Sequence, residues 1–222
     1  MDAVIFDCDG VLIDSETIGQ HVELECLAEI GLIYDRAEYA DRYMGTVSGD
    51  FFGGLDRDHR ARFGTPLPYD FADLLHARTW AALDADLVAI AGVERALAGM
   101  TAAKAIASGS TIAGLDKKLR KVGLFDTFAP HIYSSELVAR GKSAPDVFLH
   151  AAKQLGVPGD RCIAVEDSVN GTLAARAAGM RVIGFVGGGH CTPGHGARLS
   201  AAGAEVVIEH MNALLAALGR MS

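Results

Sequence analysis

The chain has 222 residues, half of them hydrophobic, and its formal net charge is −8. This length allows one large domain or two smaller ones, each with its own apolar core. The acidic balance excludes a partner bound mainly through its phosphate backbone, because nucleic-acid binding needs a basic surface. A small anionic substrate needs only local positive charge and stays open.

Targeting signals and cysteines indicate the compartment. The N-terminal residues show neither a basic region followed by an apolar one nor a cleavage site, so we expect no signal peptide. No apolar stretch is long enough to cross a bilayer. Cys8, Cys26, Cys162 and Cys191 are widely spaced, which favours reduced thiols over a disulfide framework. We expect a cytoplasmic protein without a membrane partner, as a monomer or weak homodimer.

The first predicted element is a buried strand at Ala3–Phe6, which ends abruptly at Asp7-Cys8-Asp9-Gly10. The segments that follow have helical periodicity. An i,i+4 apolar stripe from Ile18 to Ile30 predicts a helix that ends at Gly31. Further helices are predicted at about 35–43, 47–57 and 69–85, with turns at Gly53-Gly54 and at 64–66. Residues 15–87 therefore form a predicted all-helical unit.

From Gly92 onward, strand-like and helix-like runs alternate. The predicted strands lie at 103–107, 131–134, 162–165, 181–186 and 204–208, and the predicted helices at 111–122, 145–155, 169–178, 195–202 and 211–219. This alternation predicts a parallel sheet covered by helices on both faces. The first strand belongs to the same sheet. We therefore expect a Rossmann-like α/β core of residues 1–14 and 88–222, with a helical cap domain of residues 15–87 inserted into it.

Polar groups follow several of these predicted strands. They are Asp7 and Asp9, Ser108, Lys142, and the pair Glu166-Asp167. Alone, each fits an ordinary role: a polar turn, a helix cap or a solvated lysine. In a parallel sheet, however, the carboxyl ends of the strands share one edge, so the groups converge. Carboxylates held this close repel each other, and a divalent cation such as Mg²⁺ resolves that conflict.

The order of these groups and the sequence motifs around them resemble those of the haloacid dehalogenase superfamily of Mg²⁺-dependent phosphohydrolases. The resemblance is to the branch of β-phosphoglucomutase and phosphoglycolate phosphatase. Four motifs carry the resemblance: Phe-Asp-x-Asp-Gly-Val from Phe6, Ala-Ser-Gly-Ser from Ala107, Gly-Lys-x-Ala-Pro-Asp-Val-Phe from Gly141, and Glu-Asp-Ser-x-x-Gly from Glu166. The chain departs from many relatives at Ser143, where they have proline.

The resemblance implies a role for each acid. Asp7 is the nucleophile and forms an aspartyl-phosphate. Asp9 protonates the leaving alcohol, deprotonates the attacking water and faces Mg²⁺ with its main-chain carbonyl. Asp167 is the second carboxylate ligand of the metal, with Glu166 close by or acting through a water molecule.

The resemblance also implies contacts with substrate. Ser108, the Gly109 amide and Lys142 hold the phosphoryl oxygens. The cap closes over the site, and its candidate substrate residues are Arg42, Thr46, Ser48, His76 and Arg78.

The implied function is a phosphatase acting on a small phosphorylated metabolite. A phosphomutase of the β-phosphoglucomutase type is the alternative, although Gly49 stands where that branch usually has arginine, and Gly19 where it has a cap histidine. A non-catalytic domain that binds a phosphorylated metabolite is an alternative of another class. We interpret Gly187-Gly188-Gly189-His190-Cys191 as a flexible loop before a helix, near the site, because no metal-ligand spacing completes it.

Overall fold

The structure is a computed structural model that describes residues 1–43, 46 and 48–221, without the side chains of Asp41 and Ser48. The chain divides into two compact units. The core unit comprises Met1–Glu16 and Leu87–Ser222, and the helical unit comprises Thr17–Asp86. In the described part of the chain, no helix has the length and apolar character needed to cross a membrane.

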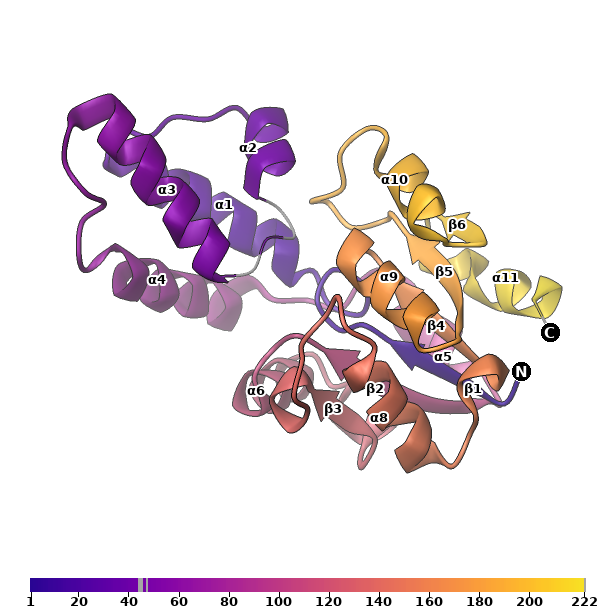
Figure 1. Cartoon of the computed structure of the whole chain (residues 1–222). Coiled ribbons are helices and arrows are strands. Elements are labelled where there is room, and N and C mark those ends of the chain that lie inside the picture. The colour runs from indigo at the N-terminus through magenta and orange to yellow at the C-terminus, as the bar shows by residue number, and fades with distance from the viewer. Residues whose placement is uncertain (44–45, 47, 222) are drawn as a thin grey trace. The chain divides into compact units, whose positions relative to one another are not determined.

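The core unit contains one parallel sheet, as predicted, with strand order β3-β2-β1-β4-β5-β6 (Figure 1). Its strands are β1 Ala3–Phe6, β2 Ala103–Ser108, β3 Ile132–Ser134, β4 Cys162–Glu166, β5 Arg181–Phe185 and β6 Val206–Ile208. All four residues of β1 are fully buried, because this strand lies in the middle of the sheet and is covered on both faces. The α/β class expected from the sequence is confirmed.

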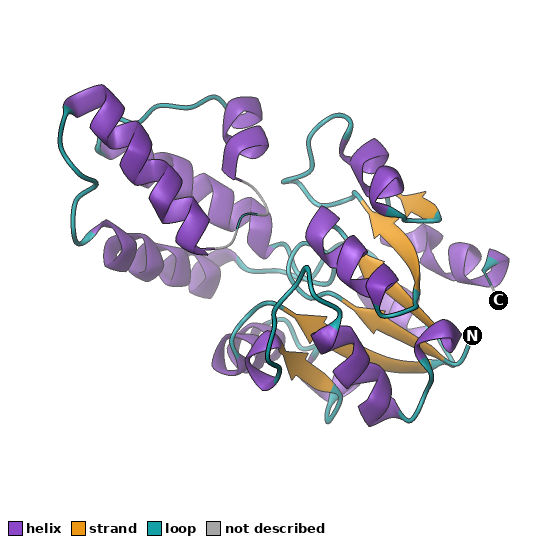
Figure 2. Cartoon of the chain, viewed as in Figure 1, coloured by secondary structure: helices purple, strands orange, loops and turns teal. Residues whose placement is uncertain are grey.

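Helices cover the sheet on both faces (Figure 2). The helices of the core unit are α5 Val93–Ala98, α6 Ile112–Lys121, α7 Phe125–Phe128, α8 Asp146–Leu155, α9 Val169–Ala177, α10 His195–Ala202 and α11 Leu214–Arg220, with short 3₁₀ turns η1 Ser135–Leu137, η2 Gly159–Arg161 and η3 Met211–Ala213. Ile5 belongs to an apolar cluster with residues of α8, α9 and α10. Phe6 points to the opposite face and meets Phe128 of α7 edge-on, at 5.7 Å between ring centroids.

Two of these helices, α5 and α7, are absent from the sequence prediction. Both are short, so neither shows the repeated apolar spacing by which a helix is recognised. Tertiary packing stabilises them instead, since Val93 and Leu97 of α5 and Phe128 of α7 are buried.

The helical unit contains α2 Arg36–Tyr43, α3 Ser48–Phe63, α4 Phe71–Asp86 and α1 Ser15–Glu29 from Thr17 onward. The predicted turn at Gly53-Gly54 is wrong, because α3 continues through both glycines. A Cβ atom at Gly54 would lie 2.8 Å from Cε1 of Tyr43, so this glycine lets the aromatic ring pack against the helix backbone.

Candidate active site

Three carboxylates gather at the carboxyl ends of β1 and β4. Asp7 follows β1, while Glu166 is the last residue of β4 and Asp167 comes next. Because Phe6 pairs with Val165 in the parallel register, the residues that follow these two are neighbours. Each carboxyl group offers an oxygen within 4.8 Å of the others, and the residues are only 8, 0 and 5% exposed. Among the described residues, no other group of acids, histidines and cysteines could hold a metal ion.

Lys142, from the loop before α8, is the cation of this cluster. Its Nζ donates a hydrogen bond to Glu166 Oε1 at 2.6 Å and lies 2.8 Å from Asp7 Oδ1 in an ion pair. The other Glu166 oxygen accepts bonds from the Ser168 amide and hydroxyl, at 3.0 and 2.9 Å. With all three carboxylates ionised, one ammonium would leave two negative charges, the charge that one divalent cation balances. This oxygen-donor set fits Mg²⁺.

Burial and mutual repulsion shape the protonation of the cluster. Burial raises the pKa of Asp7 well above its ordinary value, the charges of Glu166 and Asp167 add to the effect, and Lys142 opposes it. Burial and the neighbouring Glu166 likewise raise the pKa of Asp167. Although burial favours a neutral amine, the carboxylates of Asp7 and Glu166 raise the pKa of Lys142, which therefore stays charged.

The carboxylate of Asp9 has its own set of partners and lies outside the three-acid cluster. Its Oδ1 accepts hydrogen bonds from Ser15 Oγ at 2.5 Å and from Lys118 Nζ, and its Oδ2 accepts one from Ser110 Oγ at 2.7 Å. Burial by itself raises the pKa of Asp9, but the Lys118 ammonium and these hydrogen bonds hold it below the ordinary value. In this structure Asp9 is therefore an ionised acceptor.

Lys118 is a residue that the sequence analysis missed. It lies on α6, is 6% exposed, and bonds to Ser110 Oγ at 2.8 Å as well as to Asp9. The available signal was its spacing, because Leu115, Lys118 and Leu119 fall on one helix face. A lysine on an otherwise apolar face needs a buried partner.

Ser108 and Gly109 lie at the end of β2 and in the turn after it. The hydroxyl of Ser108 is buried, accepts a hydrogen bond from the Ser110 amide at 3.1 Å, and lies 3.5 Å from Asp9 Oδ2. A Cβ atom at Gly109 would meet nothing within 4 Å, so its backbone borders open space. An anion could reach this turn, which begins α6 with the Thr111 hydroxyl as its N-cap.

Two glycines create the space for the acids. Gly10 has φ +72°, and a Cβ atom there would lie 1.9 Å from Asp167 Oδ2. At Gly171 the Cβ atom would lie 1.8 Å from Glu166 Oε1. Both distances are far below van der Waals contact, so the glycines of the first and last motifs let the backbone approach the carboxylates.

The glycine-rich loop after β5 also reaches the cluster. His190 is 4% exposed, and its Nε2 lies 2.9 Å from Asp167 Oδ2. His195, at the start of α10, places its Nε2 2.5 Å from the main-chain oxygen of Asp167. The sequence interpretation of this segment as a flexible loop missed both contacts, because nothing in the local spacing identifies Asp167 as a partner.

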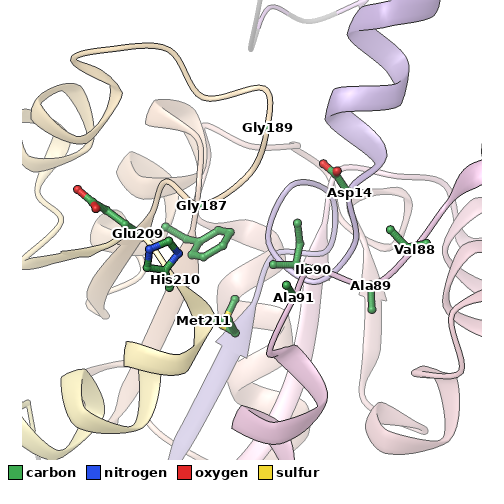
Figure 3. Close-up of a pocket in the computed structure, with 11 residues that line it drawn as sticks. Asp14, Val88, Ala89, Ile90, Ala91, Gly187, Gly189, Glu209, His210 and Met211 are labelled. Carbon is green, nitrogen blue, oxygen red and sulfur yellow. The ribbon is translucent and has the colours of Figure 1, made fainter.

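A pocket of about 280 Å³ lies elsewhere in the core unit (Figure 3). Its walls are apolar at Val88, Ile90, Phe185 and Met211, and its polar groups come from Asp14, Glu209 and His210. The three clustered acids and Lys142 are not among the residues that line it. The pocket and the acidic cluster are therefore lined by different residues.

Arg42 and Arg78, two of the substrate residues expected in the helical unit, have partners within that unit. Arg42 forms ion pairs with Asp58 at 2.5 Å and Glu38 at 3.4 Å. Arg78 pairs with Glu29 at 2.6 Å. The side chain of Ser48 lies outside the described residues.

A model of the haloacid dehalogenase-like hydrolase family matches residues 1–179. The chain belongs to this family. The resemblance inferred from the four motifs is thus confirmed, and the chain is a phosphoric monoester hydrolase of the haloacid dehalogenase superfamily.

Similar proteins include both a named enzyme and solved structures. The 6-phosphogluconate phosphatase of Escherichia coli K12 is 30% identical over 194 residues, which cover 87% of this chain and 86% of that enzyme. A haloacid dehalogenase-like protein of unknown function from Agrobacterium tumefaciens is 43% identical, with a TM-score of 0.91 and coverage of 100 and 99%. A family hydrolase from Deinococcus radiodurans, solved with bound phosphate and sodium, is 38% identical, with a TM-score of 0.84 and coverage of 99 and 96%.

Proposed function

We propose that this chain is a Mg²⁺-dependent phosphatase that hydrolyses a small phosphorylated metabolite through an aspartyl-phosphate on Asp7. The observation that carries the proposal is the buried cluster of Asp7, Glu166 and Asp167 around Lys142. A sugar phosphate, or a phosphorylated sugar acid or hydroxy acid, is the substrate class. The similarity to 6-phosphogluconate phosphatase supports that class.

The carboxylates of Asp7 and Asp167 would hold the cation, together with the main-chain carbonyl of Asp9, and Glu166 would assist directly or through water. When bound, Mg²⁺ supplies positive charge to the phosphoryl oxygens and offsets the repulsion between Asp7 and an anionic substrate. The fit rests on the two uncompensated negative charges of the cluster and on its all-oxygen donor set.

The chain's own groups then account for both half-reactions. A carboxylate oxygen of Asp7 attacks phosphorus, and the bond from phosphorus to the ester oxygen breaks as Asp9 gives that oxygen a proton. In the second half, Asp9 takes a proton from water, whose oxygen attacks phosphorus and releases phosphate and the free Asp7 carboxylate. Lys142, the Ser108 hydroxyl and the Gly109 amide stabilise the charge on the phosphoryl oxygens.

Asp9 needs a proton before it can act as the acid. In the structure, its carboxylate is ionised and bound to Lys118, Ser110 and Ser15. We propose that this is the resting arrangement, and that substrate binding changes the partners of Asp9 before the proton is transferred.

The helical unit is proposed as the lid that selects the substrate, through Arg42, Ser48 and Arg78. Because Arg42 and Arg78 are ion-paired within that unit, each would exchange a carboxylate partner for substrate. Replacing either arginine with alanine should then change the ranking of substrates more than the turnover of p-nitrophenyl phosphate.

The test is a panel of phosphorylated sugars, sugar acids and hydroxy acids, with kcat/KM measured from phosphate release, with Mg²⁺ and with EDTA. We expect Mg²⁺-dependent release of phosphate and preference for one substrate class. Isomer formation without phosphate release would identify a mutase instead. Binding without either reaction would identify a non-catalytic domain. Either of these two results would overturn the proposal.

A further inference from the structure

We propose that His190 is a positioning residue that sets the affinity of the acidic cluster for its divalent cation by holding the carboxylate of Asp167. The inference rests on the proposed function, because it assumes that the cluster binds a cation. It concerns a residue outside the four motifs, on the loop between β5 and α10.

The first observation is the contact itself. His190 Nε2 lies 2.9 Å from Asp167 Oδ2, and both side chains are almost completely buried, at 3 and 6% exposure. The same nitrogen lies 3.5 Å from Cys191 Sγ. Its ion-pair contact with one carboxylate oxygen of Asp167 restricts the rotation of that carboxylate. Polar contacts of this kind, made by groups that do not touch the metal, orient its ligands and affect its affinity.

The second observation is that the backbone makes room for the ring. A Cβ atom at Gly10 would lie 2.8 Å from Cε1 of His190, and one at Gly188 would lie 2.5 Å from the same atom. The loop from Gly187 to Gly189 therefore brings the histidine close to the turn after β1. This packing leaves the imidazole little freedom to turn away from Asp167.

The third observation is that the main chain of Asp167 is held as well. His195 Nε2 lies 2.5 Å from the Asp167 carbonyl, which can only accept, so this nitrogen carries the proton. The other nitrogen of His195 then accepts from the Arg198 guanidinium at 3.1 Å. Two histidines of one segment thus fix Asp167, one through its side chain and one through its backbone.

The fourth observation argues against a purely space-filling role. The Nδ1 atom of His190 is buried and has no hydrogen-bond partner among the described residues. An unpaired buried nitrogen has a free-energy cost that an apolar side chain of similar size would avoid. The imidazole is explained better by its ion-pair contact with Asp167 than by packing alone.

The test uses the full-length protein freed of metal, with Mg²⁺ binding measured by calorimetry and by the shift in melting temperature, both without substrate. We expect His190→Ala to bind Mg²⁺ about 10- to 100-fold more weakly than the wild type. His190→Gln keeps an N–H donor and should restore most of the affinity. His210→Ala replaces an exposed histidine of the same unit and should leave binding unchanged.

Kinetics provide a second readout. The Mg²⁺ concentration for half-maximal rate should rise in His190→Ala by the same factor as the dissociation constant, while kcat at saturating Mg²⁺ stays within a few-fold of wild type. The melting temperature in EDTA shows whether each variant is folded. If His190→Ala does not fold, the comparison of His190→Gln with His190→Asn takes its place, and the better-reaching glutamine should bind Mg²⁺ more tightly.

Equal Mg²⁺ affinity of wild type and a folded His190→Ala variant would overturn the inference and leave the proposed function standing. The proposed function would be overturned if the wild type did not bind Mg²⁺. It would also be overturned if Asp167→Asn bound Mg²⁺ as tightly as the wild type. The two failures are therefore distinguishable.

Discussion

The ammonium of Lys118 donates a hydrogen bond to Asp9, although the two residues lie 109 positions apart in the chain. Asp9 is the acid expected to move the proton in both half-reactions, and Lys118 lies outside the motifs that predict the site. The pair is largely buried, with side-chain exposures of 7% for the lysine and 16% for the aspartate. Removing one partner of this buried pair should therefore lower the free energy of unfolding.

Lys118→Met should destabilise the protein by about 3 kcal/mol, because it leaves the charge of Asp9 buried without its counter-ion. Adding Asp9→Asn should recover a large part of that loss, since it removes the orphaned charge. The free energy of unfolding in urea measures both effects. Lys153→Met, at an exposed position of α8, is the control and should stay within about 0.5 kcal/mol of wild type. Additive losses in the double variant would contradict the pairing.

Gly171→Ala tests the close approach of α9 to Glu166. Alanine is the better helix former, by about 1 kcal/mol, but its methyl group would lie 1.8 Å from Glu166 Oε1. We expect a net loss of about 1 to 3 kcal/mol and reduced phosphatase activity, since Glu166 must move. Gly219→Ala in α11 is the matched control, because its methyl group would meet nothing within 4 Å. Thermal melts of the two variants should shift in opposite directions, and a stabilised Gly171→Ala would be inconsistent with this packing.

Asp58 should make the stability of the helical unit depend on pH. It accepts hydrogen bonds from Tyr34 at 2.6 Å, Tyr43 at 2.5 Å and Arg42 at 2.6 Å. Burial raises the pKa of Asp58, but these bonds and the charge of Arg42 bring it below the ordinary value. A lowered folded-state pKa contributes stability above the unfolded pKa of about 3.9, and this stability is lost as pH falls through the folded value.

Asp58→Asn should therefore cost about 1 to 2 kcal/mol at pH 7, and the difference from wild type should shrink between pH 5 and pH 3. Urea denaturation at each pH gives the difference. The same difference at pH 7 and at pH 3 would mean that the Asp58 charge is not what stabilises the unit.

Cys191 should be the thiol that reacts first in the native protein. The structure has four free cysteines, of which Cys8, Cys26 and Cys162 are buried and Cys191 is half-buried. Burial raises the pKa of the Cys8 thiol well above its ordinary value and that of Cys162 to about 11, so both stay protonated and unreactive near pH 8. Titration with a chromogenic disulfide should show one fast thiol per chain, and four after denaturation. Cys191→Ser should abolish the fast phase, and persistence of that phase would place the reactive thiol elsewhere.

The strands and their common edge can be predicted from the sequence because both depend on local pattern and general topology. The four apolar residues of β1 form a strand with the predicted bounds. A parallel sheet places the residues after its strands at one edge, as predicted, and the pairing of β1 with β4 then brings Asp7 and Asp167 together. Gly31 likewise ends α1 with φ +83°, a conformation that glycine adopts without strain.

Long-range packing defeats the same reasoning elsewhere. Glycine is typical of turns, but Gly54 lies inside α3, where it contacts Tyr43. A lysine on a helix is usually solvated, yet Lys118 binds Asp9, which comes from a turn distant in the sequence. His190 follows three glycines that suggest only flexibility, and its contact with Asp167 exists only after β4 and β5 have paired. In each case the residue's conformation or contact depends on a residue from another element of the fold.

The most direct test of the account is phosphate release from p-nitrophenyl phosphate by the wild type and by Asp7→Asn, each with Mg²⁺ and with EDTA. The substitution keeps the shape of the side chain and removes the nucleophilic oxygen. We predict a Mg²⁺-dependent wild-type rate and a loss of at least about 1,000-fold in Asp7→Asn. Equal rates for the two folded proteins would contradict the assignment of Asp7 as the residue that receives the phosphoryl group.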